Sequence, residues 1–119
     1  MSGIKFEPGQ IVATPGALEA FRSSGDDPLA YLARHLAGDW GDVDEHDRKE
    51  NERSLEHGWR ILSCYRLKDG TRIRIITEAN RSVTYLSTSG GVLSFNLQRV
   101  PYLRRNCAER QPRCTGHLQ

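Results

Sequence analysis

The sequence has few cysteines, no long hydrophobic run and little net charge, and each shortage excludes a class of protein. Its three cysteines are an odd number, and Cys64 lies inside a predicted strand, so a framework of disulfides is not expected. No apolar run approaches the ~18 residues that span a membrane, and the first residues do not resemble a signal peptide. These features predict a cytoplasmic protein in a reducing compartment.

The length and the charge set further limits. A chain of 119 residues is long enough for one domain with a modest core, but not for two. The net charge of +2 and the pI of about 8.6 are too mild to indicate nucleic-acid binding by themselves. Beyond Asn96 there are five arginines and one acidic residue. We therefore predict a single α+β domain over residues 1–97 and a basic, mobile tail over residues 98–119.

Motifs of catalysis are also missing. No glycine-rich loop precedes a helix at the spacing that phosphates require, and there is no Gly-x-Ser-x-Gly turn around a nucleophile. The densest group of metal-ligand types is Asp44, Glu45, His46 and Asp47, followed by Glu50. A metalloprotease helix would need a second histidine four residues after the first, which is absent here. A solvated charged face explains this group more simply.

A second group of metal-ligand types lies near the end of the chain. Cys107, Cys114 and His117 have the spacing Cys-x6-Cys-x2-His. Structural zinc sites use four ligands and closer pairs of cysteines, so this spacing is a weak indication of a metal. We predict no metal site, no cofactor and no enzymatic activity.

The strongest pattern that is present is a β-hairpin. Residues 61–67 and 71–77 are rich in β-branched and aromatic side chains and are separated by Lys-Asp-Gly. A two-residue Asp-Gly turn would pair Tyr65 with Arg74. A three-residue loop, with its glycine in the left-handed conformation, would pair Tyr65 with Ile73 instead.

The three-residue loop sorts the side chains of the hairpin by polarity, which favours that register. One face is then apolar and comprises Ile61, Tyr65, Leu67, Ile73 and Ile75. The other face carries the arginines Arg66, Arg72 and Arg74. A second turn at residues 79–81 leads into a strand at 82–86, which completes an antiparallel meander, and residues 92–97 could form a fourth strand.

The first half of the chain has the spacing of three helices, which we expect over residues 15–25, 28–38 and 44–57. The third has few apolar residues and lies in an acidic stretch, residues 39–56, which has eight acidic and three basic residues. We expect this helix to lie on the surface, with Trp40 and Trp59 as the anchors that pack it against the body.

These elements predict an α+β fold in which N-terminal helices pack on a C-terminal three- or four-stranded antiparallel sheet. Residues 6–13 are expected to form a turn and a short edge strand or an extended arm.

Several segments together resemble one protein family. They are GQIVATPGALEA at residues 9–20, LARH at 32–35, GDWG at 38–41, DRKENE at 47–52 and IITEANRS at 75–82. The chain resembles, over residues 9–84, a widespread family of small bacterial "plasmid-related" proteins of plasmids, prophages and integrative elements. After Tyr85 it departs from that family, whose members end soon afterwards in an acidic segment. The resemblance implies an accessory protein of a bacterial mobile genetic element.

Two functions fit the sequence best. The first is a non-enzymatic module that binds a host or defence protein complex, such as an inhibitor of CRISPR or restriction enzymes. Its contact residues would be the acidic side chains Asp44, Glu45, Asp47, Glu50 and Glu52. The alternative is a nucleic-acid-binding factor that uses Arg66, Arg72 and Arg74 with the tail, although arginines also keep a one-sided sheet soluble. A hydrolase or metal-dependent nuclease built on His46 is the least supported function.

Overall fold

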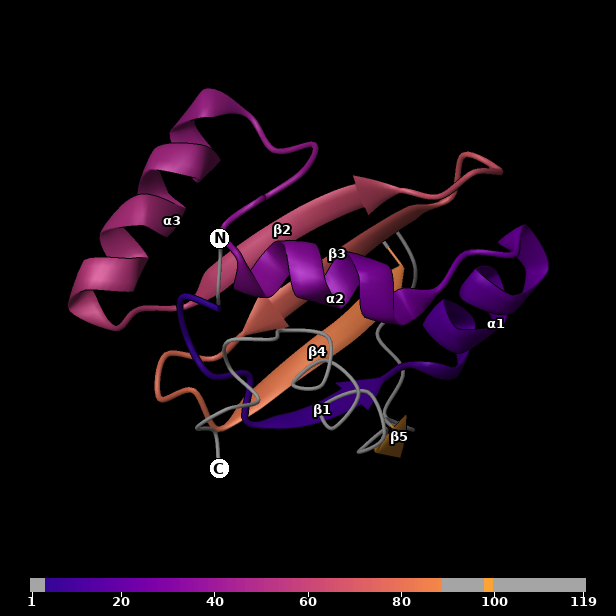
Figure 1. Ribbon diagram of the computed structural model, residues 1–119, viewed down its shortest axis with the longest axis horizontal. Coiled ribbons are helices and arrows are strands. Elements are labelled where there is room, and N and C mark those ends of the chain that lie inside the picture. The colour runs from indigo at the N-terminus through magenta and orange to yellow at the C-terminus, as the bar shows by residue number, and fades with distance from the viewer. Residues whose placement is uncertain (1–3, 89–97, 100–119) are drawn as a thin grey trace.

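The computed structural model describes residues 4–88, 98 and 99 of the chain. Within them, three helices pack on one sheet, which is the predicted α+β class; the helices precede every strand except β1 (Figure 1). The elements in chain order are β1 (Gln10–Ala13), α1 (Pro15–Ser24), α2 (Pro28–Leu36), α3 (Glu45–His57), β2 (Ile61–Arg66), β3 (Arg72–Thr77), β4 (Val83–Thr88) and β5 (Gln98–Arg99).

The order of strands in the sheet is β2-β3-β4-β1-β5. Strands β2, β3 and β4 form the predicted antiparallel meander. The expectation of a purely antiparallel sheet is wrong, because β1 pairs with β4 in parallel, with Gln10 opposite Val83 and Ala13 opposite Leu86. The expectation that β1 lies at an edge is also wrong, since β1 has β5 on its other side. Three consecutive buried residues in β1 suit this interior position.

The hairpin adopts the predicted register. Tyr65 is opposite Ile73, and Ser63 is opposite Ile75. The loop is closed by two hydrogen bonds: Leu67 N–H donates to the Thr71 carbonyl (2.8 Å) and Gly70 N–H donates to the Leu67 carbonyl (2.9 Å). Gly70 has a φ of 92°, a conformation that glycine adopts without steric cost.

The helices begin and end where the sequence predicts, because local side chains fix their ends. Thr14 Oγ1 accepts a hydrogen bond from Ala17 N–H (3.1 Å) at the start of α1. Asp27 and Asp44 cap α2 and α3 in the same way. Gly25, in the left-handed conformation, ends α1.

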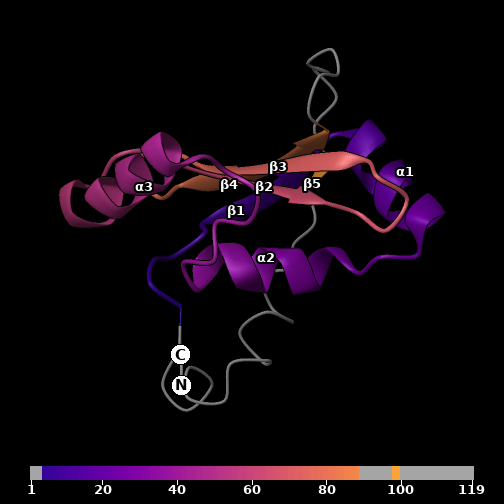
Figure 2. The same ribbon diagram turned by 90° about the horizontal axis from the view of Figure 1, so that it is seen from above.

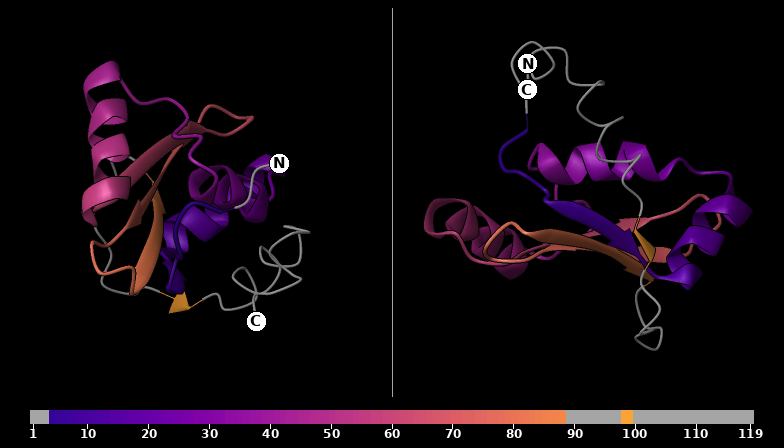
Figure 3. Two further views of the ribbon diagram at one scale, coloured as in Figure 1. Left: turned by 60° about the vertical axis from the view of Figure 1, so that its left-hand side comes forward. Right: turned by 90° about the horizontal axis from the view of Figure 1, so that it is seen from below.

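Helix α2 covers one face of the sheet, α1 lies at one end of the sheet, and α3 lies beside β2 at the other end (Figures 2 and 3). The main core lies between α2, α1 and the sheet. It comprises Ile11, Ala13, Ala17, Phe21, Leu29, Leu32, Leu36, Tyr65, Leu67, Ile73, Ile75 and Leu86. No described helix covers the opposite face of the sheet, which therefore carries its side chains without a helical partner (Figure 2).

Some predictions fall on residues that the structure does not describe. The fourth strand expected at residues 92–97 lies outside the described residues, and so do Cys107, Cys114 and His117. Strand β5 lies at the start of the segment that was predicted as a tail. Its two residues instead pair with β1 and belong to the sheet. None of the described helices has the length and apolar character needed to cross a bilayer.

Candidate functional site: an acidic helix on a strand edge

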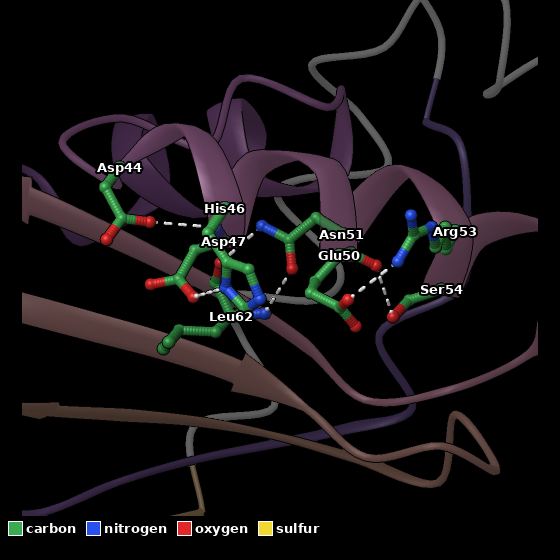
Figure 4. A network of polar contacts seen from close by, with 8 residues as sticks. All are labelled: Asp44, His46, Asp47, Glu50, Asn51, Arg53, Ser54 and Leu62. Carbon is green, nitrogen blue, oxygen red and sulfur yellow. Dashed lines mark hydrogen bonds and ion pairs between the residues drawn. The ribbon is translucent and has the colours of Figure 1, made fainter.

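Helix α3 is attached to the sheet by a buried amide rather than by an apolar face. Asn51 Nδ2 donates to the Leu62 carbonyl (2.7 Å), and Leu62 N–H donates to Asn51 Oδ1 (3.1 Å) (Figure 4). Only 3% of the Asn51 surface is exposed. The side-chain amide thus makes the two bonds to β2 that a neighbouring strand would make.

The loop before α3 satisfies the next part of the same strand edge. Cys64 N–H donates to the Trp40 carbonyl (3.1 Å), and Asp42 N–H donates to the Cys64 carbonyl (2.6 Å). Together with Asn51, these bonds occupy the outward backbone groups of Leu62 and Cys64. Paired backbone groups offer no template for another strand, so this edge is closed to strand addition at Leu62 and Cys64.

Trp40 anchors α3, as predicted. It is 3% exposed, and its Nε1–H donates to Glu52 Oε2 (3.0 Å). Its ring also packs near His35 and stacks with Phe6, with ring centres 6.1 and 6.3 Å apart. Glu52 is therefore a structural partner of the core tryptophan as well as an exposed acid.

The other predicted protein-binding acids also have internal partners. Asp44 Oδ1 accepts from Asp47 N–H (2.8 Å) and caps the helix, while the Asp47 carboxylate lies 3.5 Å from His46 Nδ1. Two ion pairs join residues three apart along the helix: Glu45 with Arg48 (2.5 Å) and Glu50 with Arg53 (3.0 Å). Such exposed pairs contribute little free energy, so these carboxylates can exchange partners at small cost.

The outward surface of α3 is a stripe of charged residues spaced three or four apart, comprising Glu45, Lys49, Glu52 and Glu56. All four are exposed. The Glu56 carboxylate has no hydrogen bond or ion pair with any other described residue. The structure therefore places on one accessible stripe two of the predicted acids, Glu45 and Glu52, and adds Glu56. Asp44 and Asp47 instead stabilise the first turn of the helix.

The group of metal-ligand types at the start of α3 is compact. One ligand atom each from Asp44, His46 and Asp47 lies within 4.8 Å of the others. Asp44 is committed to the helix cap, and the three side chains are largely solvated. An exposed group of this kind does not by itself indicate a metal site.

The predicted arginine surface divides into two parts. Arg66 and Arg72 are directly opposite one another on β2 and β3, and both reach Asp42 Oδ2, at 3.7 and 3.1 Å. Asp42 offsets the repulsion between these like charges. Arg74 differs because it is half-buried and its Nε is buried without a hydrogen-bond partner among the described residues. All three arginines share the predicted face of the hairpin, but Arg74 is less exposed there than Arg66 and Arg72.

Trp59 does not have the predicted role. It is 49% exposed, and its ring stacks on the imidazole of His57, with ring centres 4.7 Å apart. The left-handed conformation of Gly58, with a φ of 74°, ends α3 and turns the chain before the indole can reach the core. The sequence shows an aromatic residue after a helix-ending glycine, but not the direction in which the side chain points.

A buried polar chain below α2 was not foreseen from the sequence. His35 Nδ1 lies 2.5 Å from Ser63 Oγ, and His35 Nε2 lies 2.9 Å from Thr77 Oγ1. Thr77 Oγ1 is 2.8 Å from Thr84 Oγ1, which donates to the Pro8 carbonyl (2.7 Å). Burial and, to a smaller extent, the positive charge of Arg81 lower the pKa of His35 to about 3. Ser63 and His35 have no exposed surface. This pair therefore joins β2 to α2 and is not placed to meet a substrate.

One open hollow of about 310 Å³ lies at the turn between β3 and β4. It is lined by Glu78, Ala79, Asn80, Ser82, Val83 and Tyr85. The Ser82 hydroxyl donates to the side chain of Asn80 (2.6 Å), and Glu78 pairs with Arg60 (3.3 Å). These contacts fix the turn and place no base beside the hydroxyl.

Comparison of the chain with protein-family models, with curated proteins and with solved structures gives no match.

Proposed function

We propose that the protein is a non-enzymatic binding module that presents the outward stripe of α3 to a basic surface on another protein. The observation that supports this proposal is the way in which α3 is attached. Asn51 and Trp40 fix the helix by hydrogen bonds to Leu62 and Glu52, so the helix is rigid although it has almost no apolar contact. Its acidic residues are consequently held in a fixed array at one end of the molecule (Figure 1).

A fixed array with an excess of one charge favours association with a complementary surface in two ways. It raises the rate of encounter, and it costs little side-chain or backbone ordering on binding. The stretch at residues 39–56 has five more acidic than basic residues, whereas the whole chain has a net charge of +2. The negative charge of residues 39–56 is therefore a local feature, which the average composition of the chain does not explain.

The resemblance to small proteins of bacterial mobile elements supports a biological setting for this activity. A protein of such an element gains by binding host machinery, and nucleases of defence systems have basic grooves for their substrates. We propose that the partner is a basic, nucleic-acid-binding protein complex of the bacterial host, and that the acidic stripe occupies its groove. The cytoplasm is the compartment in which such a partner would be met.

The proposal is tested by single charge reversals on the stripe. Glu45→Lys and Glu56→Lys lie outside the helix cap and the Trp40 contact, so both variants should fold. The immobilised protein would capture its partner from a nuclease-treated lysate of the native host, and the association rate would then be measured with the purified partner. Each reversal should slow association roughly threefold at low salt, with a smaller effect at high salt.

Glu19→Lys is the matched control. Glu19 is exposed on α1 and pairs with Arg22 three residues later, just as Glu45 pairs with Arg48, but it lies at the opposite end of the sheet (Figure 2). This control should leave association unchanged. If the α3 reversals and Glu19→Lys have the same effect, the acidic stripe is only a solubilising surface and the proposal fails.

A second function is favoured by Arg74. Among the described residues its buried Nε has no hydrogen-bond partner, and it lies on the face of the sheet that no described helix covers, where its guanidinium could also meet a phosphate. Replacing Arg66, Arg72 and Arg74 together by glutamine tests this function. If the wild type binds DNA or RNA with a steep salt dependence that the triple variant loses, nucleic-acid binding becomes the preferred function.

A further inference from the structure

Trp59 is the one large hydrophobic side chain that stands exposed in the described part of the chain, at 49% of its surface. Its ring lies almost parallel to the imidazole of His57, with an angle of 23° between the planes. The neighbouring imidazole supports the indole from one side. Trp40, the other tryptophan, is buried, so the two indoles have different roles.

The backbone of Trp59 is fixed at both polar groups. Its N–H donates to the Ser54 carbonyl (3.2 Å), and its carbonyl accepts from Arg81 Nη1 (2.7 Å). Gly58, which precedes it, makes its own hydrogen bond to Ser54 (2.9 Å). A side chain mounted on such a backbone is already ordered, which lowers the entropic cost of binding to it.

The formal charges around this indole balance, because Arg60 and Arg81 are positive and Glu78 and Glu56 are negative. Arg60, the next residue, pairs with Glu78 (3.3 Å). Arg81 Nη1 is also within hydrogen-bond distance of the carbonyls of Glu78 (3.1 Å) and Ala79 (3.2 Å), and Nη2 donates to that of Ser54 (3.1 Å). Glu56, three residues before the tryptophan, has no partner among the described residues. The carbonyl end of α3 adds partial negative charge at the same place.

We propose that Trp59, supported by His57, binds the side chain of an arginine or lysine from the protein partner. The positive charge would lie over the indole face, which attracts cations, and would be close to Glu56 and to the carbonyl end of α3. A nucleic-acid base could also stack on an indole, but its phosphates would meet the acidic stripe of α3. The inference rests on the proposed function only in taking the partner to be a basic protein.

The first experiment uses an oligo-arginine peptide as the probe and an oligo-glutamine peptide as its neutral control. Binding would be followed by tryptophan fluorescence and by calorimetry with the full chain. Oligo-arginine should alter the emission of Trp59, and Trp59→Leu should weaken its binding about threefold. Trp59→Phe, which keeps an aromatic face, should restore part of the affinity. Circular dichroism of each variant verifies that the fold is retained.

Three outcomes separate this inference from the proposed function. If Glu45→Lys and Glu56→Lys weaken peptide binding but Trp59→Leu does not, the aromatic site is wrong and the acidic surface stands. If Trp59→Leu weakens binding and Glu45→Lys does not, the aromatic site stands and the acidic stripe fails. If a single-stranded oligonucleotide changes the emission of Trp59 and oligo-arginine does not, the site stacks bases and the inference is overturned.

Discussion

His35 Nε2 donates a hydrogen bond to Thr77 Oγ1. The direction of this bond is fixed by the Pro8 carbonyl, which ends the same chain of hydrogen bonds. The Pro8 carbonyl can only accept, so the Thr84 hydroxyl donates to it across 2.7 Å. Thr84 Oγ1 must then accept from Thr77, and Thr77 Oγ1 must accept from the imidazole. Nδ1 is left to accept from the Ser63 hydroxyl (2.5 Å). The chain of donors therefore requires one neutral tautomer of His35.

This arrangement predicts that the protein loses stability on mild acidification. The pKa of His35 is about 3 in the folded protein, against an ordinary value of 6.5 in an unfolded chain. Between these two values the unfolded state holds more protons, so the free energy of unfolding falls as the pH falls. The slope should be roughly 1.4 kcal/mol per pH unit below about pH 6. Urea unfolding at intervals from pH 7 to pH 5 measures it, because the imidazole of the unfolded chain takes up its proton in this range.

Two variants identify the group responsible. His57→Gln removes an exposed imidazole and should leave the slope unchanged. His35→Gln should lower stability at pH 7 but flatten the dependence between pH 7 and pH 5. An unchanged slope in His35→Gln would assign the acid sensitivity to another residue.

The hydrogen bonds of Arg81 lead to a second prediction about stability. It has a φ of 58°, unusual for a residue with a side chain, and its guanidinium bridges the carbonyls of Ser54 and Trp59 to the turn after β3. A lysine has one ammonium group and cannot span these acceptors. Arg81→Lys should therefore lower the free energy of unfolding by about 2 kcal/mol, measured by denaturant unfolding. Arg60→Lys, on an exposed ion pair, is the control and should change it by less than about 0.5 kcal/mol. Equal losses in both variants would contradict the bridging role.

The sequence was sufficient where local chemistry decides the structure. The register of the hairpin follows from the positions of Tyr65, Ile73 and Gly70, and the start of α1 follows from Thr14 before a proline. The parallel pairing of β1 could not be read in this way. It joins residues far apart in the chain, and a run of three buried residues does not specify the direction of its neighbour.

The candidate site was only partly predictable, for a related reason. A helix rich in Glu, Arg and Asn has the pattern of a solvated surface, yet Asn51 and Ser54 are buried and take the place of an apolar face. The hydrogen bonds of Asn51 depend on a strand edge that the local sequence does not show, whereas Ser54 Oγ donates to the Glu50 carbonyl within the helix. The signal was present in the spacing: Asp47, Asn51 and Ser54 recur three or four apart on the same side of the helix.

Asn51 gives a prediction that tests the attachment of α3. Asn51→Asp keeps the shape of the side chain and the acceptor for Leu62 N–H, but it places a carboxylate oxygen against the Leu62 carbonyl. At pH 7 this should lower the free energy of unfolding by about 2 to 3 kcal/mol. Protonation of the new carboxyl group restores a donor, so the difference from the wild type should narrow as the pH falls. A difference independent of pH would show that α3 does not depend on the bond to that carbonyl.

Gly41 provides the sharpest test of the closed strand edge. A Cβ at this position would lie 2.1 Å from the Cys64 carbonyl oxygen and 2.5 Å from the ring of Tyr65, and the φ of 73° adds strain. Gly41→Ala should therefore displace the loop that covers β2 and cost more than about 3 kcal/mol, measured by denaturant unfolding. Gly25 is the matched control, since its φ is 76° but nothing lies within 4 Å of its added Cβ. Gly25→Ala should cost only about 1 kcal/mol, the conformational part of the effect. If both variants lose the same stability, the close approach of residue 41 to the strand does not exist in solution, and the edge of β2 is open.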